Sequence, residues 1–194
     1  MTRNRLEAFS DGVIAILITI MVLELRPPHG TEVADLAPLL PKLLSYLLSF
    51  TFLGIYWNNH HHLLHAVQRV NGRVLWANAH LLFWLSLTPF VTAWMGEHGA
   101  APVTVAAYGV VLLLSGVAYF LLARALLALH GASSPLARAL GSDRKGKLSV
   151  VAYAVAIPLA FACRWVSIAI YVAVALAWWV PDLRIERTLG GREA

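Results

Sequence analysis

The chain has 194 residues, of which 59% are hydrophobic and 13% charged, and its mean hydropathy is +0.70. Ordinary soluble domains carry about 25% charged residues, so this composition excludes a water-soluble class. The single cysteine, Cys163, excludes an intrachain disulfide framework. The net charge of +5 is spread over short loops, which favours contact with anionic lipid head groups over nucleic acid. The composition therefore predicts one all-α membrane domain over residues 1–194.

Six apolar segments are long enough to cross a bilayer, which takes about 20 helical residues. The first resembles a signal peptide, but Arg26 and two prolines stand where a cleavage site would be, so we expect an uncleaved helix. The apolar run 148–181 is too long for one upright crossing, and a tight turn at Cys163-Arg164-Trp165 would divide it. The expected helices cover residues 6–26, 39–67, 73–95, 102–129, 147–163 and 165–182.

The distribution of Lys and Arg predicts the orientation, because cytoplasmic loops of membrane proteins are enriched in these residues. With the N-terminus inside, six crossings leave only Arg26, Lys42 and Arg164 on the outer side. The cytoplasmic side then holds Arg3, Arg5, Arg69, Arg73, Arg124, Arg138, Arg144, Lys145, Lys147, Arg184, Arg187 and Arg192. We therefore expect both termini to be cytoplasmic.

The first expected helix has two different faces. It opens with residues 5–11, RLEAFSD, and is then apolar except for Thr19. At 100° per residue, Asp11 points about 140° away from Ile16. The same periodicity gives a common face to Phe9, Ile16, Ile20 and Leu23. The helix thus presents an aliphatic stripe to one neighbour and a carboxylate to another.

Polar residues of the first three helices fall at a similar depth. Polar groups inside a membrane are costly and usually have a partner. With a rise of about 1.5 Å per residue, these groups lie in one inner layer near the basic helix ends. We expect Asp11 and Ser10 to bond to His60, His61, Asn78 or the indole of Trp57. The interpretation we favour is that this network joins three helices.

These residues resemble a known family. Arg5-x-x-x-Phe9-Ser10-Asp11 matches the RxxxFSD signature of the transmembrane-protein-175 potassium channels, which comprise the endolysosomal channel of animals and its prokaryotic relatives. The likeness extends to Trp57-x-x-His60-His61, Trp76-Ala77-Asn78 and Pro89-Phe90. It covers the first half of the chain closely and the last three helices only by hydropathy.

The resemblance implies a leak-type, potassium-selective channel in the plasma membrane of a prokaryote, with K⁺ as the permeant ion and no cofactor. It also implies a pore without a re-entrant carbonyl filter, and the chain has no TVGYG-like segment. In the family the first helix lines the pore and a ring of bulky aliphatic residues constricts it. Carried over, that residue is Ile16, with Thr19 as the pore threonine, Leu23 as an outer apolar layer and Ile20 on the same face. Animal members carry two motif copies and work as dimers, so one copy here implies a homotetramer.

Glu24 sits at the outer end of the same expected helix, about 80° from the direction of Ile16. Four copies would concentrate cations at an outer pore mouth. A solvated carboxylate at a helix end near Arg26 explains this residue equally well.

Parts of the sequence are also compatible with functions other than a potassium channel. His61 and His65 are four residues apart, and imidazole suits zinc, so a zinc transporter is one alternative. However, no Asp or Glu lies between Lys42 and Glu97, and a carboxylate ligand would have to come from Asp11. A proton-permeable cation channel is a second alternative. We expect no enzyme and no resident metal, because the chain lacks a nucleophile elbow, an HExxH motif and a phosphate-binding glycine loop.

Overall fold

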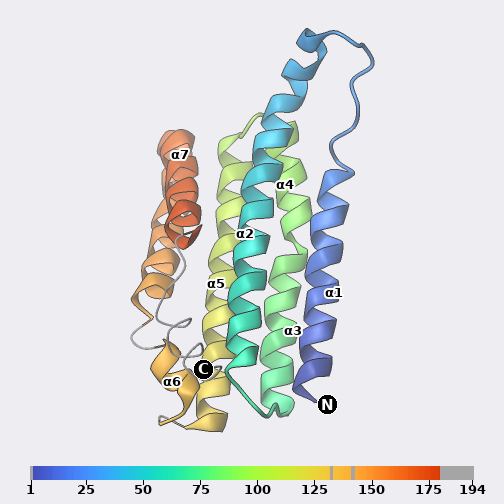
Figure 1. Ribbon diagram of the computed structural model, residues 1–194. Coiled ribbons are helices and arrows are strands. Elements are labelled where there is room, and N and C mark those ends of the chain that lie inside the picture. Colours follow the sequence, from blue (N-terminus) through green and yellow to red (C-terminus); the bar gives the residue numbers. More distant parts are fainter. Residues whose placement is uncertain (1, 132, 141–142, 180–194) are drawn as a thin grey trace.

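The structure is a computed structural model that describes residues 2–131, 133–140 and 143–179, and these residues form helices and loops without a strand. Figure 1 shows a bundle of upright helices, with the short α6 near the N-terminal end of the bundle and η1 beyond the opposite end. The elements are α1 (Arg3–Val22), the 3₁₀ helix η1 (Val33–Leu39), α2 (Leu40–His65), α3 (Gly72–Ser86), α4 (Thr88–Glu97), α5 (Pro102–His130), α6 (Pro135–Leu140) and α7 (Arg144–Trp179). The prediction of an all-helical protein is confirmed.

Among the described residues, four helical stretches are long and apolar enough to cross a membrane, namely Val33–His65, Gly72–Glu97, Pro102–His130 and Arg144–Trp179. The helix α1 is not among them, because its first half carries Arg3, Arg5, Glu7 and Asp11. Six crossings therefore stay a prediction.

The first helix is shorter than expected. We expected residues 6–26, but α1 ends at Val22 and its last N–H groups fold into a tighter turn, with Leu23 N–H bonded to Ile20 O. Pro27 and Pro28 oppose further helix, because the residue before a proline is driven out of the α conformation. The expected helix 39–67 corresponds to α2, and the expected 102–129 to α5, after which Gly131 takes the left-handed φ of 83°.

The third expected helix, 73–95, is broken. The structure has α3 and α4 stacked end to end, and Leu87 separates them. Pro89 explains the break, since it lacks an N–H and its ring collides with the carbonyl four residues earlier, that of Leu85. A Pro inside an apolar run was visible in the sequence and should have divided this segment.

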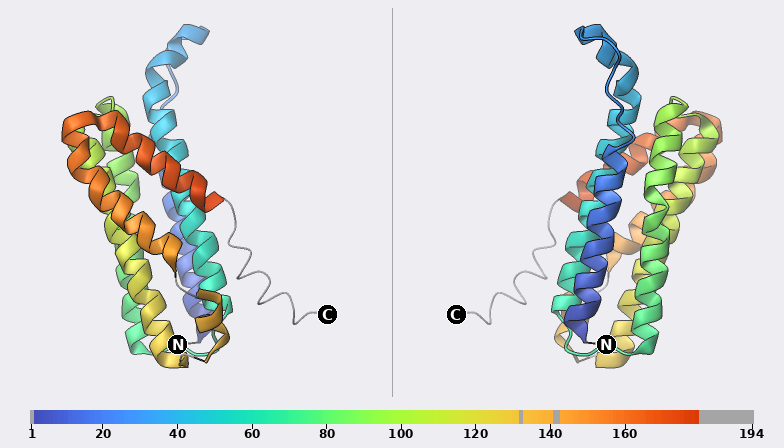
Figure 2. Two further views of the ribbon diagram at one scale, coloured as in Figure 1. Left: turned by 90° about the vertical axis from the view of Figure 1, so that its left-hand side faces the viewer. Right: turned by 90° about the vertical axis from the view of Figure 1, so that its right-hand side faces the viewer.

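The long α7 has two arms. Cys163 lies within the residues assigned to α7, but its dihedral angles, φ −153° and ψ 94°, are not helical. Figure 2 shows the second arm turning back beside the first. This residue begins the turn expected at Cys163-Arg164-Trp165. The end of the expected helix 165–182 and the C-terminus lie outside the described residues. The helix α6 was not expected, because it lies between the expected helices 102–129 and 147–163.

Two apolar clusters hold the bundle. One joins α1, α2, α3 and α5 in the half nearer the N-terminus, around Leu64, Leu81 and Leu122. The other joins α2, α4, α5 and α7, around Phe52, Tyr108 and Tyr171. The helix α1 lies at the side of this arrangement and contacts α2, α3 and α4.

Basic residues gather at one end of the bundle. This is the end where α1 begins, where α2 connects to α3 and where α6 lies (Figure 1). Its described members are Arg3, Arg5, Arg69, Arg73, Arg124, Arg138, Arg144, Lys145 and Lys147. The opposite end holds Arg26, Lys42 and Arg164. The remaining arginines of the predicted cytoplasmic set, Arg184, Arg187 and Arg192, lie outside the described residues.

Candidate functional site

The buried residues of the helix α1 all lie on one of its faces. Its buried side chains recur every three to four residues, as a helix face requires, and they are Leu6, Ser10, Ile14, Leu17 and Met21. They contact the cluster that also contains Leu63, Leu81 and Leu85. This face fixes how the helix is rotated about its own axis.

The opposite face of α1 is exposed and apolar. Ile16 is 57% exposed, Ile20 44%, Leu23 74% and Phe9 57%. Gly12 lies on the same face, and a Cβ added there would have no atom within 4 Å. The four apolar residues that the sequence placed on one face therefore lie together, on a surface that the described part of the chain leaves uncovered.

Thr19 is also on this exposed face. Its hydroxyl donates to its own helix, with Oγ1 at 2.9 Å from Ile16 O and 3.1 Å from Ala15 O. The hydroxyl proton is thus used, and the oxygen lone pairs remain for an outside donor or cation. Glu24 is exposed in the turn after α1, and it borders a small hollow together with Lys42 and Glu97.

A buried hydrogen-bonded chain ties α1 to α3 and α2. Asn78 Nδ2 donates to Ser10 Oγ at 2.9 Å, and Ser10 Oγ donates to Leu6 O at 2.9 Å. His60 Nε2 lies 2.7 Å from Asn78 Oδ1, and because a carbonyl oxygen only accepts, Nε2 carries the proton. His60 Nδ1 is buried and has no hydrogen-bond partner within the described part of the chain.

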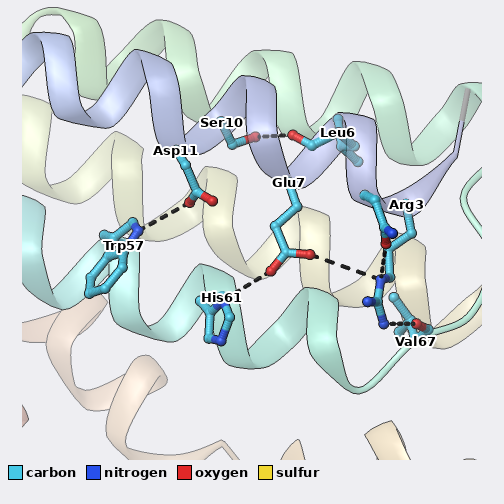
Figure 3. Close-up of polar contacts among 9 residues, drawn as sticks. Arg3, Leu6, Glu7, Ser10, Asp11, Trp57, His61 and Val67 are labelled. Carbon is cyan, nitrogen blue, oxygen red and sulfur yellow. Dashed lines mark hydrogen bonds and ion pairs between the residues drawn. The ribbon is translucent and has the colours of Figure 1, made fainter.

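A second set of contacts joins α1 to α2 on a more exposed flank (Figure 3). Trp57 Nε1 donates to Asp11 Oδ1 at 3.1 Å. One turn toward the N-terminus, Glu7 Oε1 lies 2.9 Å from His61 Nδ1, and its other oxygen lies 3.9 Å from Arg3 Nε. Arg3 in turn donates to Val67 O at 3.3 Å.

The single network expected from the sequence is thus two separate networks. Ser10 and Asp11 are adjacent, so their side chains diverge by about 100°, and one reaches α3 while the other reaches α2. Glu7 was missed by the sequence analysis, although a signal existed. Arg3, Glu7 and Asp11 are spaced by four residues, as are Trp57 and His61, so both helices carry matching polar stripes.

Two residues of the motif make little contact within the chain. Arg5 is exposed, and the described residues provide it with no hydrogen bond or ion pair. Phe9 is exposed beside it on the apolar face. Their roles stay predictions.

The histidines of α2 do not assemble a metal centre among the described residues, which contain no group of three or more His, Cys, Asp or Glu placed to hold an ion. The rings of His61 and His65 stack at 5.9 Å, and His61 Nδ1 already contacts Glu7. No observation here favours the zinc alternative.

Comparison with known proteins decides the family. A profile of the family described as "Endosomal/lysosomal potassium channel TMEM175" matches residues 5–89. A potassium channel of Chryseobacterium sp. (strain P1-3) is 50% identical over 97% of this chain and 98% of its own length. The chain belongs to the TMEM175 family. It is therefore a multi-pass membrane protein of an ion channel family, and the resemblance seen in the sequence is confirmed.

Further members of the TMEM175 family show how the likeness is distributed. A potassium channel of Chamaesiphon minutus is 30% identical over 89% of this chain and 91% of its own length. The crystal structure of a lysosomal potassium-selective channel TMEM175 homolog from Chamaesiphon minutus superposes with a TM-score of 0.79, at 28% identity, over 92% of this chain and 96% of the other. The human endosomal/lysosomal proton channel TMEM175 is 33% identical, over 36% of this chain and 16% of its own.

Proposed function

We propose that this chain is a leak-type, potassium-selective channel of a prokaryotic plasma membrane, with six crossings and both termini in the cytoplasm. Support comes from two bacterial relatives that are named potassium channels. Each aligns with this chain over nearly its whole length. The basic end of the bundle supports the orientation, since cytoplasmic segments are enriched in Lys and Arg. Counting α1 as a crossing and each arm of α7 as one brings the four long apolar stretches to six.

The exposed apolar face of α1 is the observation that carries the pore assignment. Four copies of the chain around one axis would bring four such faces together, with Ile16 of each copy forming the narrowest ring. The protomer's own contacts support this use of the face, because α1 is anchored by its opposite side and by its flank. Lipid contact alone would not explain why Thr19 and Gly12 share this face.

The chemistry of such a ring favours a weakly hydrated cation. An aliphatic constriction obstructs the passage by dewetting when narrow and admits ions when it widens. An ion that loses its water at a lower free-energy cost passes more readily, which ranks potassium above sodium. Thr19 oxygens would follow Ile16 one turn further out, and Glu24 would raise the local cation concentration at the outer mouth.

The two polar networks are proposed to hold the pore helix and not to conduct. Each joins α1 to a neighbouring helix, and their side chains point away from the face of Ile16. In lipid an unsatisfied polar group costs several kcal/mol, so these contacts would fix the rotation of α1 strongly.

The test is a reversal-potential measurement on purified protein in a planar bilayer, under opposed potassium and sodium gradients. A reversal potential close to the potassium equilibrium potential supports the proposal. No current, or equal permeability to the two ions, would reject it. A second measurement imposes a proton gradient without a potassium gradient, because the human relative is named a proton channel. A reversal potential that follows pH would favour the proton-permeable alternative.

A further inference from the structure

A cavity of about 310 Å³ lies between α2, α5 and both arms of α7, away from α1. Its size falls in the range of about 300–1,000 Å³ that is usual for ligand pockets. Apolar side chains form most of its wall, among them Phe52 and Ile55 of α2, Val117 and Phe120 of α5, and Val150 and Val151 of α7. Neither polar network of α1 reaches it.

Two hydrogen-bond donors of the wall have partners within it. Tyr119 hydroxyl donates to Asn59 O at 3.1 Å, and Trp178 Nε1 donates to Ser149 Oγ at 2.8 Å. These donors are therefore satisfied without a ligand. What the wall offers to an occupant is apolar surface, and this favours a hydrocarbon chain over water, which needs several polar partners.

The cavity reaches the surface of the protein within the membrane-spanning part of α7. Val151 lines it and is 57% exposed, whereas Phe52 on the inner wall is 2% exposed. Val151 belongs to a long apolar stretch whose outer surface would face lipid. An acyl chain could therefore enter sideways from the bilayer without passing through water.

The mouth of the cavity is basic. Lys147 also lines it and lies one helical turn before Val151. Arg144 and Lys145 are adjacent, at the basic end of the bundle, and Asp143 contributes a carboxylate that accepts from Gly146 N–H at 3.2 Å. Lys147 and Asp143 are the charged residues of the wall itself, and Lys145 approaches it through the ring of Trp178, 5.0 Å from its Nζ. Basic pockets between membrane helices on the cytoplasmic side bind anionic lipid head groups.

We propose that this cavity is a binding site for an anionic phospholipid. One acyl chain lies between α2, α5 and α7, and the head-group phosphate lies at Lys147. The lipid site does not include the proposed pore face of α1, so a failure of the pore assignment would leave this proposal unaffected.

The experiment is native mass spectrometry of the purified full chain after titration with an equal mixture of phosphatidylglycerol and phosphatidylcholine. We expect the wild type to retain phosphatidylglycerol in preference. Val151→Trp fills the cavity and should lower the amount of retained phosphatidylglycerol several-fold. Val155→Trp is the matched control, because Val155 is exposed one turn further along α7 and does not line the cavity. Equal retention by the wild type and Val151→Trp would overturn the proposal.

A second pair of variants tests the head group. Lys147→Gln should remove the preference for phosphatidylglycerol while retention of phosphatidylcholine stays the same, and Arg73→Gln, at the same basic end but on α3, should change neither. If sodium oleate competes equally well in the wild type and in Lys147→Gln, the head-group assignment is wrong. Size-exclusion elution identifies a misfolded variant. If Val151→Trp misfolds, the Lys147 and Arg73 pair alone decides the outcome.

Discussion

Asn78 Nδ2 donates a 2.9 Å hydrogen bond to Ser10 Oγ across the buried contact between α3 and α1. Ser10 donates onward to Leu6 O, so its hydroxyl is satisfied as donor and as acceptor. Rotating α1 by one residue would turn it by about 100° and place a different side chain against Asn78. This contact therefore helps to determine that Ile16 faces outward.

Replacement of Asn78 by Ala should destabilise the protein without changing ion preference. The substitution leaves the buried His60 Nε2–H without an acceptor and the Ser10 hydroxyl oxygen without a donor. The expected loss in unfolding free energy is about 1–3 kcal/mol. The measurement is the midpoint of thermal unfolding, followed by fluorescence-detected size exclusion. Asn58→Ala is the control, because Asn58 is exposed on α2. Equal midpoints for the two variants would contradict this reading.

Asp11 and Trp57 should be energetically coupled. Asp11→Ala and Trp57→Phe each remove the same 3.1 Å hydrogen bond, so the double variant should lose about 0.5–1.5 kcal/mol less than the sum of the single losses. Unfolding in graded denaturing detergent measures the three variants. Asp11→Asn keeps an acceptor oxygen and should retain most of the stability. Strict additivity, or a changed reversal potential in Asp11→Ala, would show that Asp11 has another role.

Ile16→Asn should lower the potassium to sodium permeability ratio by about tenfold, equivalent to about 1.4 kcal/mol of lost discrimination. The physical reason is that an amide at the proposed constriction would replace part of the ion's lost hydration and so would favour sodium as well. Reversal potentials in a planar bilayer provide the measurement.

Two controls accompany this variant. Ile16→Leu keeps an aliphatic ring and should keep the selectivity, while Val172→Asn places the same amide at an exposed position of α7 and should leave it unchanged. A wild-type ratio in Ile16→Asn would remove Ile16 from the constriction.

Gly96→Ala should weaken the contact between α2 and α4. A Cβ at Gly96 would lie 2.9 Å from Lys42 Cα, and backbone cannot move aside as a flexible side chain can. We expect a loss of about 1–3 kcal/mol in unfolding free energy, which is typical of overpacking. Gly54→Ala is the matched control on α2, because no atom lies within 4 Å of its Cβ position. If both variants unfold alike, helix propensity and not close packing governs the change.

Some features of the site were predictable from local pattern and others were not. The common face of Ile16, Ile20 and Leu23 follows from helix geometry alone, and the structure shows these residues exposed together. The positions of these residues along their helices allowed several combinations of partners. The pairing of Asp11 with Trp57 and of Ser10 with Asn78 was one of them. Depth along a helix leaves the neighbour undetermined, since that depends on how each helix is rotated and which one stands beside it.

The order of residues is enough to assign the chain to helical membrane proteins of this family, because apolar runs of this length and a motif of fixed spacing can be recognised without a structure. It also required that the polar residues of α1 find partners, because lipid offers none. The packing of the helices was needed to learn which partners they have, that Glu7 contacts His61, and that α2, α5 and α7 leave a cavity. These contacts and the cavity depend on distances between residues that are far apart in the chain. Helix packing sets those distances, and the local sequence pattern carries no information about them.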